Sequence, residues 1–110
     1  MMNIKQLVLA IGLAGFSLAS AADEAPFEVS LVSIQNVPVI QLESVADSVT
    51  LTGYKVNRGN CGNAFINQVY NPPSKFQYGE ATKIFAHNCK VREVVLDTDQ
   101  GSFTYTFSRQ

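Results

Sequence analysis

Apolar residues recur at every second position in several segments of this chain, and this spacing restricts its fold more than any other feature. The pattern is clearest in residues 27–31, 49–51 and 103–107. Side chains at alternate positions of a β-strand share one face, so these segments predict strands with one buried and one exposed face. They are also rich in Val, Thr, Phe and Tyr, which favour strands over helices.

Six or seven strands are predicted from this pattern. They cover residues 27–35, 38–42, 47–57, 64–70, 80–87, 90–98 and 102–108. Segment 64–70 is either an edge strand or an irregular crossing. Residues 57–63, 71–74 and 99–101 are typical of turns and loops, and Gly53 predicts a β-bulge. Short strands joined by turns, with no helical segment between them, predict an all-β chain that folds as a single small antiparallel β-sandwich.

Residues 1–21 have the three parts of an export signal peptide. Lys5 gives a positive start, residues 7–18 form an uncharged apolar run, and small residues end the segment at Ala21. A membrane anchor is the alternative, but a run of about a dozen apolar residues is shorter than the roughly 20 that span a bilayer. We therefore predict cleavage after Ala21 and a mature β-sandwich domain of residues 22–110, periplasmic or secreted, with no membrane anchor.

The two cysteines, Cys61 and Cys89, are predicted to form a disulfide, because an exported chain enters an oxidising compartment. A redox-active pair is the alternative, but such pairs usually stand two residues apart, as in CxxC. In the chain-entropy model, closing a loop of this length stabilises the fold by about 3.5 kcal/mol. This is a large fraction of the roughly 5–15 kcal/mol by which domains are stable.

Few residues suggest chemistry. The formal net charge of −1 at pH 7 gives no electrostatic reason to bind nucleic acid. His87 is the single histidine, so a zinc site made of several histidines is excluded. Asp97 and Asp99 flank a turn, where aspartate commonly bonds local backbone amides, and provide only a fragment of a calcium-binding loop. We therefore predict no catalytic residue, no metal, no cofactor and no enzymatic activity.

Recognition of another protein is the remaining possibility. Tyr70, Phe76 and Tyr78 lie between the cysteines, and Arg58 lies in the turn beside Cys61. Aromatic and Arg side chains are enriched at protein interfaces, so these four residues are the predicted protein-binding positions. The alternative is that the aromatic residues build the core, which a domain of this size needs, and that Arg58 is a solvated loop residue.

Four segments together resemble a known family of proteins. They are VNRGNC at 56–61, KF with YG at 75–79, NCKVREV at 88–94 and TDQGSFTYTF at 98–107. In these segments the chain resembles the small secreted bacterial proteins related to interleukin receptor mimic protein A. The resemblance covers residues 47–107.

This resemblance implies a fibronectin type III/immunoglobulin-like sandwich that is exported and holds one disulfide. It also implies that the protein acts by binding proteins, including host cytokine-type proteins, and that it forms a homodimer by strand exchange. Three other functions are compatible with the sequence: a periplasmic inhibitor of an enzyme such as lysozyme, a structural subunit of an envelope complex, and a small hydrolase that would depend on His87.

Overall fold

The computed structural model of the protein describes residues 25–108, so the predicted signal peptide at 1–21 lies outside the described residues. Short strands make up most of the described chain. They are β1 (Phe27–Ile34), β2 (Val37–Ser44), β3 (Ser48–Val56), β4 (Ala64–Ile66), β5 (Ser74–Gln77), β6 (Ala81–Ala86), β7 (Glu93–Thr98) and β8 (Gly101–Thr106). Two single-turn 3-10 helices, η1 (Asn57–Gly59) and η2 (Gln68–Tyr70), follow β3 and β4.

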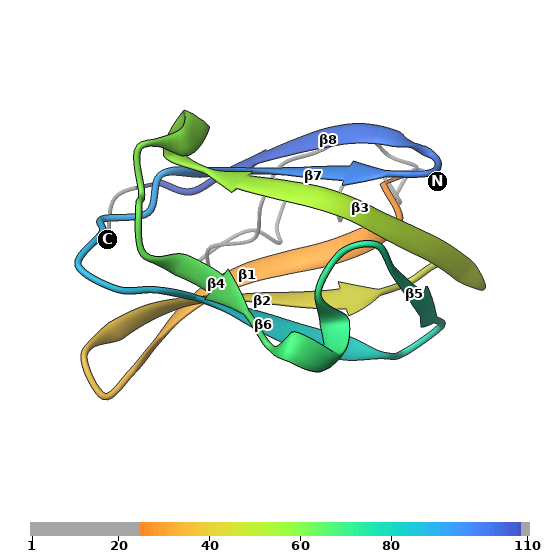
Figure 1. Cartoon of the computed structure of the whole chain (residues 1–110), viewed down its shortest axis with the longest axis horizontal. Coiled ribbons are helices and arrows are strands. Elements are labelled where there is room, and N and C mark those ends of the chain that lie inside the picture. Colours follow the sequence, from red (N-terminus) through yellow and green to blue (C-terminus); the bar gives the residue numbers. More distant parts are fainter. Residues whose placement is uncertain (1–24, 109–110) are drawn as a thin grey trace, which may run out of the picture.

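The strands form two four-stranded antiparallel sheets that pack as a sandwich, which confirms the predicted fold class. One sheet has the order β1-β2-β6-β4 and the other has the order β5-β3-β7-β8. Figure 1 shows the two layers, with β3, β7 and β8 above β1, β2 and β6. When β5 is left aside, this order is that of a constant-type immunoglobulin sandwich, in which strands A, B, E and D face strands C, F and G.

The core lies between the sheets and is built by the alternating residues that the sequence predicts to point inward. Phe27 on β1 meets Phe76 on β5 edge to face, with ring centroids 5.2 Å apart. Both side chains belong to the buried cluster, together with Val29, Ile40, Leu42, Val49, Leu51, Ile84, Val94, Leu96 and Tyr105. The hydrophobic core therefore draws on both sheets, as a sandwich requires.

Two predicted local features are confirmed. The register of β3 against β7 shifts between Leu51 and Gly53, which is the β-bulge predicted at Gly53. The turn at 99–101 joins β7 to β8 as a hairpin, and Gly101 has a φ of +121°, a conformation that glycine adopts readily.

The segment between β3 and β6 differs from its prediction. Residues 64–70 do not form one strand, because β4 ends at Ile66 and the Asn67 side chain then accepts a hydrogen bond from the Val69 amide at 2.9 Å, which caps η2. Ser74, at the end of the predicted loop 71–74, begins β5, which runs to Gln77 along the edge of β3 where no strand was predicted. The chain thus supplies an edge strand to each sheet in turn before β6 begins.

Tyr105 links the two sheets through a buried hydrogen bond. Its hydroxyl donates to the backbone carbonyl of Phe27 on β1, over 3.1 Å, and its side chain is 2% exposed. Burial raises the pKa of Tyr105 to about 12, because the phenolate would lose its hydration in the core.

We expect the fold to lose stability at alkaline pH through Tyr105. Because its pKa is raised from 10.0 to about 12 in the folded protein, the neutral side chain stabilises the fold fully below pH 10, and this contribution is lost as the pH rises through 12. Urea denaturation at pH 8 and near pH 12 should show a loss larger by about 2 kcal/mol in the wild type than in Tyr105→Phe. Equal losses in the two proteins would contradict a buried, neutral Tyr105.

Candidate protein-binding surface

The four residues predicted to bind a protein do not form one surface. Tyr78 directly follows β5, whose last residue, Gln77, pairs with Ser48 at the start of β3. Arg58 lies in η1, which follows the other end of β3. Tyr78 and Arg58 are both exposed, but they lie at opposite ends of the same sheet.

Phe76 is a core residue, so its predicted role in binding a partner is wrong. Its side chain is fully buried, because β5 pairs along β3 and turns Phe76 toward the opposite sheet. Tyr70 from η2 is half-buried and stacks on the Phe76 ring with centroids 4.8 Å apart. Tyr70 therefore covers one edge of the core, and of the three predicted aromatic residues Tyr78 is the one that stands clear of it.

The predicted disulfide is confirmed. It lies beside the segment between β6 and β7, where the chain crosses from one sheet to the other, and neighbouring residues hold that segment in place. Cys61 is bonded to Cys89, with Cα atoms 5.6 Å apart. Asn57 donates through Nδ2 to the Lys90 carbonyl at 2.8 Å, and its Oδ1 accepts from the Arg92 amide at 2.8 Å and the Glu93 amide at 3.1 Å. These bonds hold residues 90–93 against η1, so β7 begins at Glu93 and not at residue 90 as predicted.

Arg58 has a local partner in the same region. Its Nε donates to Oε1 of Glu93 at 2.8 Å, while its side chain remains 81% exposed. An ion pair this exposed contributes little to stability. Asn57 and Arg58 therefore explain the NRGNC segment as a structural motif, in which Asn57 holds the chain beside the disulfide.

A continuous apolar row crosses the outer face of the sheet β1-β2-β6-β4. Val32 on β1 pairs with Val39 on β2, Val39 pairs with Phe85 on β6, and Phe85 pairs with Phe65 on β4. Each strand thus supplies one apolar residue at the same level of the sheet. Because the neighbouring residues in each strand point into the core, these four side chains point away from it.

A second row lies beside the first, toward the β1–β2 hairpin. Ile34 pairs with Val37 across the hairpin. His87, just beyond β6, stacks on Phe65 with ring centroids 5.2 Å apart and planes 20° apart. Phe65 also stacks on Phe85 at 6.4 Å. We call the six residues Val32, Ile34, Val37, Val39, Phe65 and Phe85 the apolar rows.

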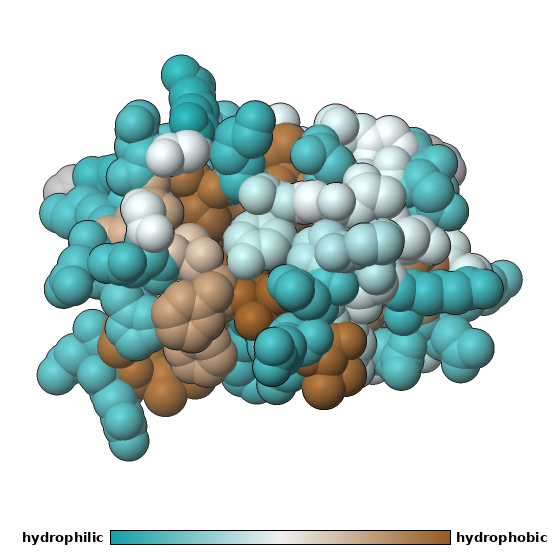
Figure 2. Space-filling view, in the orientation of Figure 1, coloured by the Kyte–Doolittle hydropathy of each residue, from teal (hydrophilic) through white to brown (hydrophobic). Residues whose placement is uncertain are grey.

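The apolar rows form a cluster of their own on the outside of the sandwich. Val39 is fully buried, yet it does not belong to the core cluster, since it is covered on the outer face between its register neighbours Val32 and Phe85. Around it the side chains open to solvent, with Ile34 37% and Phe65 52% exposed. In Figure 2 apolar surface gathers at the end of the molecule where Figure 1 places β4 and the β1–β2 hairpin.

The outer face of the other sheet, β5-β3-β7-β8, is polar by comparison. Its outward positions are mostly Thr, Ser and charged residues, including Thr50, Thr52, Lys55, Asp97, Thr104 and Thr106. Val95 is the apolar exception and is half-buried. The two faces therefore differ in kind, and within residues 25–108 the apolar rows are the outward surface best suited to bury apolar atoms of another protein.

Consecutive apolar residues in β1 and β2 are the sequence feature that indicates this surface. Residues 37–40 read Val-Pro-Val-Ile, and Leu31 is followed directly by Val32. Apolar residues at consecutive positions of a strand place apolar groups on both faces of a sheet. Such runs in an antiparallel sandwich indicate that the outer face is also covered or bound.

Residues 25–108 offer neither a metal site nor a membrane-spanning helix. In this part of the chain no group of three or more His, Cys, Asp or Glu side chains is placed to hold a metal ion. Nor does any helix described there have the length and apolar character to cross a membrane. His87, the residue on which a hydrolase would depend, lies against the Phe65 and Phe85 rings of the apolar rows, with ring centroids 5.2 Å and 6.5 Å away.

The chain was also compared with known proteins. No protein-family model, no curated protein sequence and no solved structure gives a significant match.

Proposed function

We propose that this protein is an exported, non-enzymatic module that binds another protein through its apolar rows. The observation that supports the proposal is the row of Val32, Val39, Phe85 and Phe65 in register across all four strands of one sheet, on the side away from the core. Contiguous apolar surface of this kind marks interaction sites on small soluble domains. Aromatic side chains in the row provide the rigid contact area that is typical of hot spots.

The proposed location is the periplasm or the outside of the cell. The three-part pattern of residues 1–21 supports export. The Cys61–Cys89 bond supports an oxidising compartment, because structural disulfides persist there and are rare in the cytosol.

The proposed partner class is a host protein of the cytokine type. Its support is the resemblance of residues 47–107 to secreted proteins related to interleukin receptor mimic protein A. A strand-exchanged homodimer stays a prediction of the same resemblance. A bacterial or host lysozyme and a neighbouring envelope protein are the other partners to test, since an inhibitor or an envelope subunit would have the same size, export signal and disulfide.

Replacement of Phe65 by serine is expected to weaken partner binding about 30-fold, as loss of a hot-spot aromatic does. Phe65 is exposed on an edge strand, so the variant should keep its fold. The exported protein is immobilised and used to capture cytokines, lysozymes and envelope proteins, and the affinity of each captured protein is then measured with wild type and Phe65→Ser.

Tyr78→Ser is the matched control, because Tyr78 is also an exposed aromatic residue, at 69%, but lies outside the apolar rows. It should leave the affinity unchanged. A partner that responds to Tyr78→Ser and ignores Phe65→Ser would contradict the proposed surface.

A further inference from the structure

We infer that the outer face of the β1-β2-β6-β4 sheet recognises a protein segment in which bulky apolar side chains stand next to a Lys or Arg side chain. The inference rests on the proposed function and deepens it, since it assigns a chemistry to the partner. It adds the other half of this face, which is polar and acidic, to the apolar rows.

The acidic half contains two glutamates at directly opposite register positions of β1 and β2, and neither forms an ion pair among residues 25–108. Glu28 on β1 is directly opposite Glu43 on β2, and both are exposed. Like charges at directly opposite positions of neighbouring strands destabilise a sheet. The one ion pair found among residues 25–108 joins Arg58 to Glu93, so neither glutamate is in an ion pair within this part of the protein, although Lys83 lines the same hollow. A cation from a partner would relieve this repulsion.

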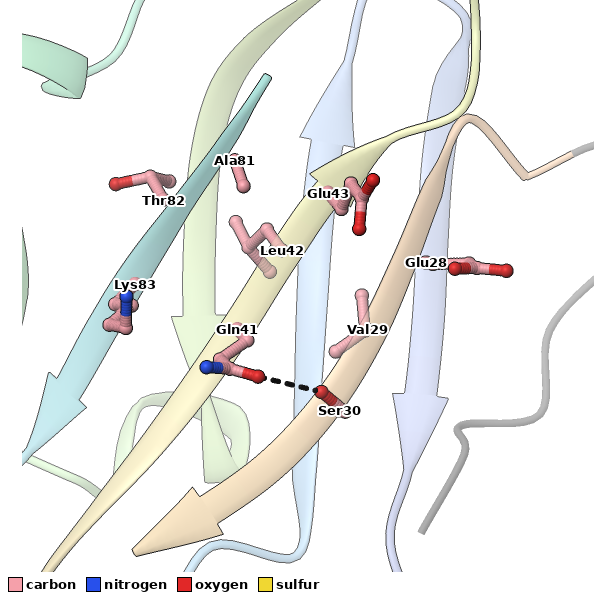
Figure 3. A pocket seen from close by; sticks show the side chains of 9 residues that line it. All are labelled: Glu28, Val29, Ser30, Gln41, Leu42, Glu43, Ala81, Thr82 and Lys83. Carbon is pink, nitrogen blue, oxygen red and sulfur yellow. Dashed lines mark hydrogen bonds between the residues drawn. The ribbon is translucent and has the colours of Figure 1, made fainter. Parts of the chain in front are cut away.

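The two glutamates border a hollow that can receive a side chain. The hollow has a volume of about 280 Å³ and is lined by residues of β1, β2 and β6, with Lys83 on its β6 side. Figure 3 shows Ser30 and Gln41 pointing toward one another between the strands, and their side chains are hydrogen-bonded at 3.3 Å. Because Lys83 would repel a partner cation, the cation would approach over the β1–β2 side of the hollow.

The spacing of the two halves restricts the partner further. Val39 in the apolar rows and Glu43 lie four residues apart on β2 and point to the same side. At about 3.3 Å per residue their side chains are about 13 Å apart. An extended partner segment would bridge this distance with an apolar side chain and a Lys or Arg four positions away.

The dimensions of the face favour a different protein over a second copy of this chain. Each of the six side chains covers about 4.8 Å across the strands and about 6.7 Å along them, which gives the apolar rows a projected area of about 190 Å². A stable interface needs roughly 800 Å² on each partner. Two copies of this chain could bury a larger area only by extending the contact beyond the apolar rows. Glu28 and Glu43 of one copy would then lie against apolar side chains of the other. A partner with its own basic group can cover both halves of the face.

The test uses three synthetic peptides with the same apolar half, followed by a lysine-rich, a serine-rich or a glutamate-rich half. Binding to the exported protein is measured by fluorescence anisotropy at about 0.15 M salt, where charges farther apart than about 8 Å are screened. We expect the lysine-rich peptide to bind best and the glutamate-rich peptide to bind worst. The double variant Glu28→Gln, Glu43→Gln should bind the lysine-rich peptide about three- to tenfold more weakly, as expected for the loss of exposed ion pairs.

The stability of the double glutamine variant is a second measurement. If the glutamates had a purely structural role, their replacement would lower the urea midpoint. Because the double variant removes a like-charge pair, its urea midpoint should be unchanged or higher than that of the wild type. Thr104→Lys with Thr106→Lys is the matched control, since it changes the net charge by the same amount on the outer face of the other sheet. This control should bind the lysine-rich peptide as the wild type does.

Three results would overturn the inference: equal binding of the three peptides, no binding of the lysine-rich peptide up to about 1 mM, or unchanged binding by the double glutamine variant. The serine-rich peptide separates this failure from failure of the proposed function. If it binds as well as the lysine-rich peptide and loses affinity in Phe65→Ser, the apolar rows bind a partner without recognising a cation.

Discussion

Replacement of both Cys61 and Cys89 by serine is expected to lower the free energy of unfolding by about 3.5 kcal/mol. The bond restricts the unfolded chain across 28 positions of sequence, and this restriction is lost in the variant. For a domain of this size the midpoint of thermal unfolding should fall by about 15–25 °C. Urea denaturation of the exported wild type and of the double serine variant measures the effect.

The reduced wild-type protein is the control for the cysteine variant. It lacks the bond but keeps both sulfur atoms in place, so it separates the loss of the cross-link from the effect of a serine hydroxyl at the buried Cys61. We expect reduction alone to produce most of the loss. A reduced protein as stable as the oxidised one would show that the disulfide does not stabilise this fold.

Replacement of Phe76 by alanine is expected to cost about 3–5 kcal/mol of unfolding free energy, as for other fully buried Phe residues. The Phe76 ring has no exposed surface and contacts Phe27 from the opposite sheet and Tyr70 from η2. Its removal leaves a cavity where the edge strand β5 meets the core. Chemical denaturation monitored by circular dichroism measures the loss.

The matched control for Phe76 stands two residues later in the chain. Tyr78→Ala removes an aromatic ring that is 69% exposed, so its stability should stay within about 0.5 kcal/mol of the wild type. Two variants so close in sequence and so different in effect would confirm that β5 turns Phe76 inward. If Tyr78→Ala were the more damaging variant, the placement of β5 would be wrong.

Much of the fold is predictable from the sequence, because period-two alternation directly reports which face of a strand is buried. The residues at 27–31, 49–51 and 103–106 lie in strands with the expected inward faces, and Phe107, just beyond β8, is also buried. The β-bulge at Gly53 is predictable too, because the alternation of apolar residues within β3 shifts at this glycine. The disulfide follows from the two cysteines together with the export pattern.

The elements that sequence analysis missed are those that local pattern does not determine. β5 has four residues, of which Phe76 alone is buried, so it offers no alternation to detect. Its strand structure comes from pairing with β3, a tertiary contact. After β4 the polar residues Asn67 and Gln68 precede the strand-favouring residues Val69 and Tyr70, and the Asn67 cap starts η2 instead of a longer strand.

The candidate binding surface depends on register, which a single sequence does not specify. Val32, Val39, Phe65 and Phe85 come from four separate segments, and strand pairing brings them into one row. Sequence reasoning instead selected aromatic residues inside the disulfide loop, where Phe76 and Tyr70 serve the core. The consecutive apolar residues of β2 were the sequence feature that indicated this surface. Alternation accounts only for the face of the strand that packs in the core, so apolar residues at the positions between must lie on the outer face.

Photo-crosslinking from inside the apolar rows tests the central claim most directly. The photoreactive residue p-benzoylphenylalanine is placed at Phe65 and, as a control, at Thr104 on the outer face of the other sheet, and each protein is irradiated with the partner bound. The account predicts a covalent adduct with the partner from position 65 and none from position 104. An adduct from position 104 without one from position 65 would contradict the claim that the apolar rows are the binding surface.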